Sequence, residues 1–332
     1  MDSPSPHQPS PRVLSGLRER ADSSSALLTL EAFIECALYH PDFGYYTTPR
    51  DRVGHSETTD FYTASSLGPV FAELVLESAR TLLDEPLSRY TFVEIGPESP
   101  HGLLGSLSRH PFQEVRLLRP GDPLDWPRNA VLFFNELLDA QPFRRFVRRR
   151  HSWKELALSV ARDELREVEI EPADPLPPLP PKAPEGYTLD WPGQAHALLN
   201  EICRRPWQGL LLSFDYGLPR ETVFHQRPEG TGRTYAAHTM GSDLLASPGQ
   251  CDITCHLIWE ELEAILHDQG FAQIQLQTQE AFFMHHAGKT IGSILESSPP
   301  GLSRRKQTLM ELLHPDNMGH KFKVLHGLRH DP

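Results

Sequence analysis

Short apolar runs along this chain predict the buried strands of a parallel sheet. The clearest lie at residues 92–95, 130–134 and 210–214, and a weaker one lies at 114–118. Strands that are covered on both faces are apolar at successive positions, whereas a half-exposed strand alternates apolar and polar residues. The sequence therefore predicts an α/β fold in which these four strands lie inside.

Polar or turn-forming residues follow the three clear runs. In open α/β sheets, ligands bind where parallel strands end, and a tight glycine turn lets backbone N–H groups face the polar end of a cofactor. The first run carries an acid and enters a glycine turn, which favours a cofactor site at its end. The residues at these three strand ends are Glu94, Gly96 and Pro97, then Asn135 and Glu136, then Asp215, Tyr216 and Gly217.

A spacing of three to four residues between apolar positions predicts helices before the sheet. One covers residues 30–38, with Thr29 as a candidate N-cap, and must stop before Pro41. A second covers residues 70–79 and opens at Gly68-Pro69, where proline is tolerated in the first turn. We expect this second helix to pack against the sheet.

The middle of the chain predicts a hairpin and an extended segment. Runs at 143–147 and 156–160 flank the arginines of residues 148–150 and form the hairpin. The arginines suit either an acidic partner or, preferably, a solvated loop. Residues 171–184 are too rich in proline for helix or sheet and serve either as a PxxP ligand or, preferably, as a surface spacer before a helix at 194–203.

Composition narrows the class of protein. The 332 residues carry a net charge of −12, which argues against a broad nucleic-acid footprint, and no apolar run reaches membrane-spanning length. The first residues lack the regions of a signal peptide, so we expect a cytoplasmic protein with reduced thiols. The predicted division is a disordered tail (1–12), an N-terminal helical segment (13–90) and an α/β domain (91–330) with insertions at 143–190 and 219–256.

Six motifs in order resemble those of the MidA-like methyltransferases and make the resemblance far more specific than one glycine loop does. They are ALYHPDFGYY from residue 37, DFYTA from 60, NELLDAQP from 135, DYG from 215, GTGRTY from 230 and PGQCDITCH from 248.

The resemblance implies a Rossmann-like methyltransferase fold of seven strands with helices on both faces. It also implies S-adenosylmethionine as the cofactor and a protein arginine as the methyl acceptor. The family includes the mitochondrial enzyme needed to assemble respiratory complex I, so a respiratory-complex subunit is a candidate partner. The site residues implied are Glu94, Gly96, Pro97 and Asn135 for the cofactor, Glu136, Asp139 and Asp215 for catalysis, and Asp60, Tyr216, Arg233, Asp252 and His256 for the acceptor.

Carboxylates suit this chemistry because they can hold and orient a guanidinium beside a sulfonium methyl group. The alternative for Glu136 and Asp215 is a capping role at the strand ends, which is as common for such residues. Zinc binding by Cys251, Cys255 and His256 is the weaker alternative to a strand in which Asp252, Thr254 and His256 share one face. His285 and His286 are expected to form a surface pair.

The chain departs from the family pattern at the cofactor. Glu98 and Pro100 stand where the family has glycines. The second strand offers Arg116 and Arg119 where the family has an acid that accepts the ribose hydroxyls, and the connection before residue 130 is too short for the usual helix. A carboxylate beside the cofactor's own carboxylate predicts weak binding.

Three functional classes therefore remain. The first is an active methyltransferase that acts on a protein side chain, which the motifs favour. The second is a pseudo-methyltransferase that serves as a binding or assembly module. The third is an enzyme for another nucleotide-like ligand, whose phosphate Arg116 and Arg119 would bind. Fold alone does not separate these classes.

Overall fold

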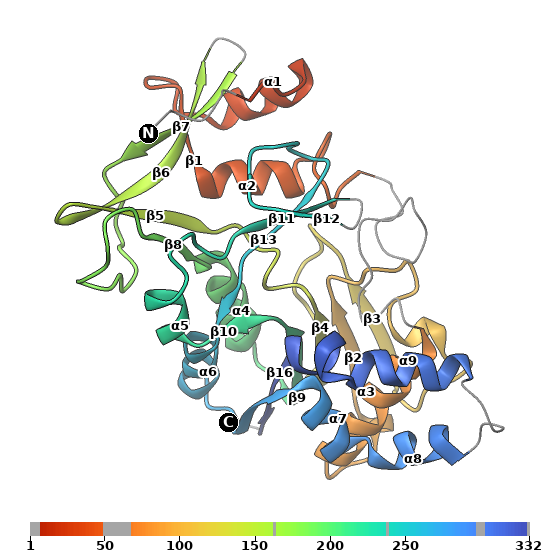
Figure 1. Cartoon of the computed structure of the whole chain (residues 1–332). Helices are drawn as coiled ribbons and strands as arrows, with labels where there is room; N and C mark the ends of the chain where they lie inside the picture. The colour runs from red at the N-terminus through yellow and green to blue at the C-terminus, as the bar shows by residue number, and fades with distance from the viewer. Residues whose placement is uncertain (1–6, 49–67, 162–163, 237–238, 297–302, 331–332) are drawn as a thin grey trace. The chain divides into compact units, whose positions relative to one another are not determined.

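The computed structural model describes residues 7–48, 68–161, 164–236, 239–296 and 303–330 (Figure 1). The contacts between residues divide the chain into two compact units, each assembled from three separated segments. Unit 1 consists of Met1–Phe61, Leu138–Ala197 and Leu218–Glu260, and unit 2 consists of Tyr62–Leu137, Leu198–Gly217 and Glu261–Pro332. Both units therefore depend on contacts between residues that are far apart in the sequence.

Unit 2 contains a six-stranded sheet in the order β15-β16-β9-β4-β2-β3. The four predicted strands form its parallel part, as the apolar runs indicated. Two further strands complete the sheet: β16 runs antiparallel to β9, and β15 runs antiparallel to β16. The bounds are β2 (Thr91–Ile95), β3 (Glu114–Leu118), β4 (Asn129–Asn135), β9 (Gln208–Asp215), β15 (Ala272–Thr278) and β16 (Lys323–Arg329).

The order of the strands reverses at β2. The chain passes from β2 to β3 on one side and then returns to form β4 on the other side of β2. Such a reversal leaves a crevice at the carboxyl ends of the two strands between which it occurs, and ligands of open α/β sheets bind there. In this chain the reversal lies between the ends of β2 and β4.

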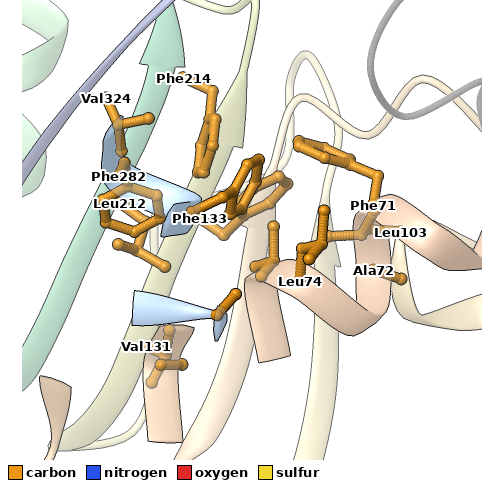
Figure 2. Packing of buried hydrophobic residues seen from close by; sticks show 14 of the residues in the cluster. Phe71, Ala72, Leu74, Leu103, Val131, Phe133, Leu212, Phe214, Phe282 and Val324 are labelled. Carbon is orange, nitrogen blue, oxygen red and sulfur yellow. The ribbon is translucent and has the colours of Figure 1, made fainter. Parts of the chain in front are cut away.

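Aromatic side chains form the core between one face of this sheet and its helices. Phe71 of α3 packs edge-on against Phe133 and Phe214 of the sheet (Figure 2). It packs in the same way against Phe283 of α7. Each of these rings is fully buried, which contributes roughly 1.5–3 kcal/mol per side chain. The predicted packing of α3 on the sheet is confirmed. The helices on this face are α3 (Pro69–Leu82), α7 (Gln279–His286), α8 (Gly288–Glu296) and α9 (Arg304–Leu313).

The opposite face of the sheet is also covered. Leu132, Phe134 and Leu211 alternate with the core residues along β4 and β9 and are equally buried. Leu266, on the C-terminal half of α6 (Trp259–Asp268), lies 3.4 Å from the position that a Cβ atom on Gly327 would take. Continuous apolar strands are the consequence of this cover on both faces. Three of the five chain positions at which the units alternate fall in α4 (Gly193–Arg204), β10 (Gly217–Leu218) and α6.

The seventh strand that the resemblance implied is missing from the described part of this sheet. Residues 119–128 connect β3 to β4 without a helix or a strand. The connection contains Pro120, Pro123 and Pro127, which have no N–H to donate, and it is shorter than the dozen residues that a helical crossover needs. The predicted loss of the helix is confirmed, and a strand is lost with it.

Unit 1 is built mainly on an antiparallel sheet in the order β1-β6-β5-β8, with β7 also paired to β6. The predicted hairpin is confirmed as β5 and β6, and the predicted N-terminal helix as α2, whose Thr29 hydroxyl accepts a bond from Ala32 N–H. The bounds are α1 (Pro11–Arg20), α2 (Leu30–Tyr39), α5 (Arg220–His225), β1 (Leu27–Thr29), β5 (Arg144–Arg149), β6 (Ser152–Ala161), β7 (Glu164–Ile170), β8 (Thr188–Trp191), β11 (Arg233–Ala236), β12 (Thr239–Gly241), β13 (Asp252–Thr254) and β14 (Leu257–Ile258).

Three local predictions need correction. His7 pairs with Leu165 and α1 begins at Pro11, so the described part of the predicted tail is placed by its neighbours. The strand expected over 252–257 breaks after Thr254, because Cys255 N–H donates to Asp139 O instead of to a strand. His285 is exposed as expected, but His286 is half-buried, with its ring packed against His326 of β16. The remaining short elements are η2 (Leu87–Arg89), η3 (Leu104–Ser106) and η4 (Pro315–Gly319).

The proline-rich segment is a strap held by the hairpin. Arg144 donates to the carbonyls of Ala173 and Pro175, and Trp153 Nε1 donates to Pro180 O. These bonds occupy carbonyl oxygens that a PxxP ligand would offer to a partner. They support the preferred interpretation of the segment as a surface spacer.

Candidate functional site

The turn at the end of β2 requires glycine at position 96. Gly96 has a φ of +71°, which disfavours residues with a side chain, and its N–H donates to Leu118 O at 2.8 Å. A Cβ atom at this position would lie 2.7 Å from Leu137 Cδ1. The chain therefore turns tightly where the strand meets the crevice.

Glu94, two residues earlier, fixes the other end of the loop. Its side chain is 3% exposed, and its Oε2 accepts a hydrogen bond of 2.7 Å from Leu103 N–H. A Cβ atom on Gly102, at φ +64°, would lie 2.4 Å from the same oxygen, so the loop requires glycine there. Burial raises the pKa of Glu94 to about 7, against the opposing effect of the Leu103 bond.

The side chain of Asn135, at the end of β4, is hydrogen-bonded to the loop that follows β2. Its Nδ2 donates to Glu98 Oε1 and to Glu136 Oε1, both at 2.9 Å. Its Oδ1 is buried and, among the described residues, accepts no hydrogen bond. A buried acceptor without a partner costs free energy unless a ligand or water supplies a donor. The Asn135 oxygen therefore marks a polar position at the crevice.

Glu136 and Asp215 lie beside Asn135 at the same edge of the sheet. Glu136 N–H donates to Phe214 O at 2.9 Å, which places it next to the end of β9. Glu136 has a φ of +50°, a left-handed conformation that is uncommon for a residue with a side chain and often found at functional sites. Asp215 is fully buried and accepts from Tyr216 N–H at 2.9 Å, so it also caps this turn.

Four of the other predicted residues lie in unit 1. Asp139 and Asp252 are buried, and Tyr46 donates its hydroxyl to Asp252 Oδ1 at 2.9 Å. The guanidinium of Arg233 donates to the carbonyls of its own loop, at Gly232 and Gly230. Burial lowers the pKa of His256. Asp60 lies outside the described residues, and Tyr216 lies in unit 2 with its ring against Phe322.

The sequence analysis missed Asp190 of β8, which holds the glycine loop of residues 230–232. Its carboxylate accepts from Arg145 Nε at 2.6 Å, from Thr231 N–H at 2.6 Å and from Gly232 N–H at 2.8 Å. An acid inside an otherwise apolar stretch, as at residues 187–191, was the available signal. Asp190 supports the backbone of a family motif.

The two arginines proposed to take a phosphate are engaged with protein groups. Arg116 forms an ion pair with Glu114 at 3.0 Å, and Arg119 donates to the carbonyls of Pro100 at 2.9 Å and Ser99 at 3.4 Å. Arg119 thus clamps the loop that follows Gly96. These contacts disfavour the third functional class.

No group of metal-binding side chains occurs within the described ranges, and Cys251 and Cys255 are buried free thiols. Burial raises the pKa of Cys255, which disfavours the thiolate that zinc needs. Of the helices that the structure describes, none is long and apolar enough to cross a membrane. Two surface hollows, one beside Trp153 and one along α8, are lined by none of the residues at the crevice.

Solved structures share this fold. A protein from Burkholderia thailandensis, crystallised with S-adenosyl-homocysteine bound, matches with a TM-score of 0.82 and 22% sequence identity over 99% of this chain and 96% of its own. An uncharacterized protein from the same organism matches with a TM-score of 0.79 at 22% identity, over the same shares of the two chains. A search of curated proteins found no match.

A family model decides the assignment. The model described as "Putative S-adenosyl-L-methionine-dependent methyltransferase" matches residues 72–277, which is more than half of the chain. The match includes β2, β4 and β9 and the crevice residues at their ends. The resemblance found in the motifs is thereby confirmed, and the chain belongs to this family of S-adenosyl-L-methionine-dependent methyltransferases.

Proposed function

We propose that this protein transfers a methyl group from S-adenosylmethionine to a side chain of a protein, with arginine as the acceptor. The observation that carries the proposal is Asn135 at the crevice, whose buried oxygen receives no hydrogen bond from the residues that the structure describes. Family membership supports the reaction class, and the arginine acceptor is supported by the motif resemblance and by the acids at the strand ends.

The crevice residues fit the cationic part of this cofactor. S-adenosylmethionine supplies an electrophilic methyl group on a sulfonium centre, and its amino-acid end carries an ammonium and a carboxylate. Asn135 Oδ1 would accept from the ammonium, and the half-buried acids Glu98 and Glu136 add negative charge beside it. Gly96 and Glu94 would hold the loop against the cofactor.

The acids at the strand ends would act on the acceptor. A carboxylate that accepts two N–H bonds from a guanidinium fixes its plane and can take the proton that N-methylation releases. Glu136 is proposed for this role because it has a left-handed backbone conformation at the end of β4, beside the crevice. Asp139 and Asp215 are proposed as further acids, and Tyr216, Arg233, Asp252, His256 and Asp60 as acceptor contacts. A respiratory-complex subunit is the proposed partner by resemblance alone.

The role of Asn135 is tested by calorimetric titration with S-adenosyl-homocysteine. Asn135→Leu keeps the size of the side chain and removes its hydrogen-bonding atoms, so the affinity should fall about tenfold or more. Circular dichroism of the variant should match that of the wild type. Equal affinities for two folded proteins would remove Asn135 from the cofactor site.

The acceptor is tested by methyl transfer from labelled cofactor to matched peptides that carry arginine or lysine. The wild type should label the arginine peptide, and Glu136→Gln should lower the rate about a hundredfold while S-adenosyl-homocysteine still binds. Labelling of the lysine peptide alone would overturn the arginine assignment, and an undiminished rate would remove Glu136 from catalysis.

One observation favours a binding module as the second candidate. Glu98 is hydrogen-bonded to Asn135 at the crevice, where the family has glycine. A module without catalysis would capture an arginine-bearing partner through Glu136, and Glu136→Gln would weaken that capture. The module would bind no S-adenosyl-homocysteine, which separates it from the enzyme.

A further inference from the structure

We propose that Arg119 is a positioning residue for the cofactor, because it braces the loop of residues 96–103 before the cofactor enters the crevice. The inference rests on the proposed function, since it takes this loop to contact S-adenosylmethionine. It goes beyond that function by assigning part of the affinity for the cofactor to a side chain at the end of the neighbouring strand, β3. Its basis is the pair of bonds that Arg119 gives to the loop and the turn that holds its own backbone.

Arg119 reaches the middle of the loop from the end of β3. Its Nη2 donates to Pro100 O at 2.9 Å and to Ser99 O at 3.4 Å. Ser99 O also accepts from Gly102 N–H at 3.2 Å, which closes a turn inside the loop. One guanidinium group therefore holds two successive carbonyl groups of this turn. A charged donor makes such bonds stronger than a neutral donor does.

The two ends of the loop are anchored to the sheet, and Arg119 holds the part between them. At the first end, Gly96 N–H donates to Leu118 O at 2.8 Å. At the second end, Leu103 N–H donates to Glu94 Oε2 at 2.7 Å. The residues between these anchors include two prolines, whose rings restrict the backbone. The brace from Arg119 thus acts on a loop that already has few conformations.

A tight turn fixes the backbone from which the Arg119 side chain extends. Asp122 N–H donates to Arg119 O at 2.9 Å, and Asp122 Oδ2 accepts from Arg119 N–H at 2.8 Å. Pro120 and Gly121 occupy the two central positions, and Gly121 has a φ of +90°. Proline followed by a residue of positive φ is typical of a type II turn. The short connection from β3 to β4 opens with this turn, so the shortening of the connection is what places the arginine.

A loop that is held before binding needs less ordering when the cofactor enters, and the free energy of ordering is subtracted from the affinity. The side chain of Arg119 is exposed, so its bonds add little to the stability of the whole fold. Loss of Arg119 should therefore weaken cofactor binding and leave unfolding nearly unchanged. Arg116 offers a matched comparison, because it lies on the same strand and is paired with Glu114 at 3.0 Å.

The test is calorimetric titration of the full chain with S-adenosyl-homocysteine, together with urea unfolding of each variant. Arg119→Met removes the charge and the donors, so the affinity should fall about fivefold while the unfolding midpoint stays that of the wild type. Arg119→Lys keeps the charge and can still donate to a carbonyl, so it should recover part of this loss. Arg116→Met removes the neighbouring arginine and should leave the affinity unchanged.

A further variant disturbs the same brace through the backbone. Within the described part of the chain, no atom lies within 4 Å of the position that a Cβ atom on Gly121 would take. Gly121→Ala therefore strains the turn through its positive φ alone, and it should weaken binding about threefold. The double variant of Gly121→Ala and Arg119→Met should bind as Arg119→Met does, because the turn acts through the arginine.

The outcomes separate this inference from the proposed function. If the wild type does not bind S-adenosyl-homocysteine, the cofactor assignment fails and the inference fails with it. If the wild type binds, the assignment stands, and three results would each overturn the inference alone. They are an affinity of Arg119→Met equal to that of the wild type, an Arg119→Lys variant that binds no better than Arg119→Met, and an equal loss in Arg116→Met.

Discussion

Glu94 shows how much one residue contributes to the shape of the crevice. It lies on a buried strand, accepts one backbone bond and excludes every side chain from position 102. Its burial is the larger effect on its pKa, which is raised to about 7 even though the Leu103 bond favours the charged form. Glu94 thus loses solvation on folding and fixes the loop in return. The resulting rise in its pKa predicts how stability depends on pH.

Replacement of Glu94 by glutamine should change the pH dependence of stability. A raised pKa means that the folded state binds more protons than the unfolded state between pH 4.5 and about 7. The contribution of Glu94 to the free energy of unfolding is therefore full below pH 4.5 and is lost as the pH rises through about 7. Urea unfolding should show Glu94→Gln gaining on the wild type over this window. A constant difference from pH 5 to pH 8 would contradict the assignment.

At the scale of elements, two histidines lie between β16 and α7. The rings of His326 and His286 are 5.5 Å apart, and both pack against Phe282. Burial lowers the pKa of His326 to about 4 and also lowers that of His286. The helix is therefore packed on the strand with both rings neutral.

Acid should loosen this packing. The unfolded state binds more protons than the folded state between pH 6.5 and about 4, so the stability from His326 is full above pH 6.5 and is lost as the pH falls toward 4. His326→Gln cannot take up this proton and should lose less stability between pH 7 and pH 4.5. Thermal unfolding at both pH values measures the difference. Parallel losses in the two proteins would show that other groups control acid stability.

At the scale of the whole molecule, both units are assembled from segments that alternate along the chain. In unit 1, Asp190 connects two of these segments: it accepts from Arg145 of its own segment and from Thr231 and Gly232 of the next. Arg145 is 8% exposed and Asp190 is fully buried. A buried pair of this kind fixes how distant segments meet.

Removal of the Asp190 carboxylate should therefore strongly lower the stability of the protein. Asp190→Ala leaves a buried guanidinium and two backbone N–H groups without an acceptor, at a cost of about 3–5 kcal/mol in the free energy of unfolding. The control is Glu169→Ala, which breaks the exposed pair with Arg149 on the same sheet and should cost less than about 1 kcal/mol. Similar losses in the two variants, measured by chemical denaturation, would refute the supporting role of Asp190.

The elements with strong local signals were predictable from the sequence. The helix capped by Thr29, the helix opened by Pro69 and the apolar strands β4 and β9 all formed where periodicity and turn residues placed them. The positions of Asn135 and Asp215 at strand ends followed from the same patterns. These features depend on neighbouring residues, whose side-chain period and backbone preferences are written in the sequence itself.

The contacts that define the crevice were decided only by the tertiary structure. Asn135 is hydrogen-bonded to Glu98, which lies 37 positions earlier in the sequence. No helical or strand periodicity connects residues that far apart. Glu94 meets Gly102 because a loop folds back, and Asp139 falls in a different unit from Asn135 although only three residues separate them. A sequence pattern determines which face of a strand or helix is buried. The strand order and the loop path determine which distant groups meet, and these depend on packing summed over the whole fold.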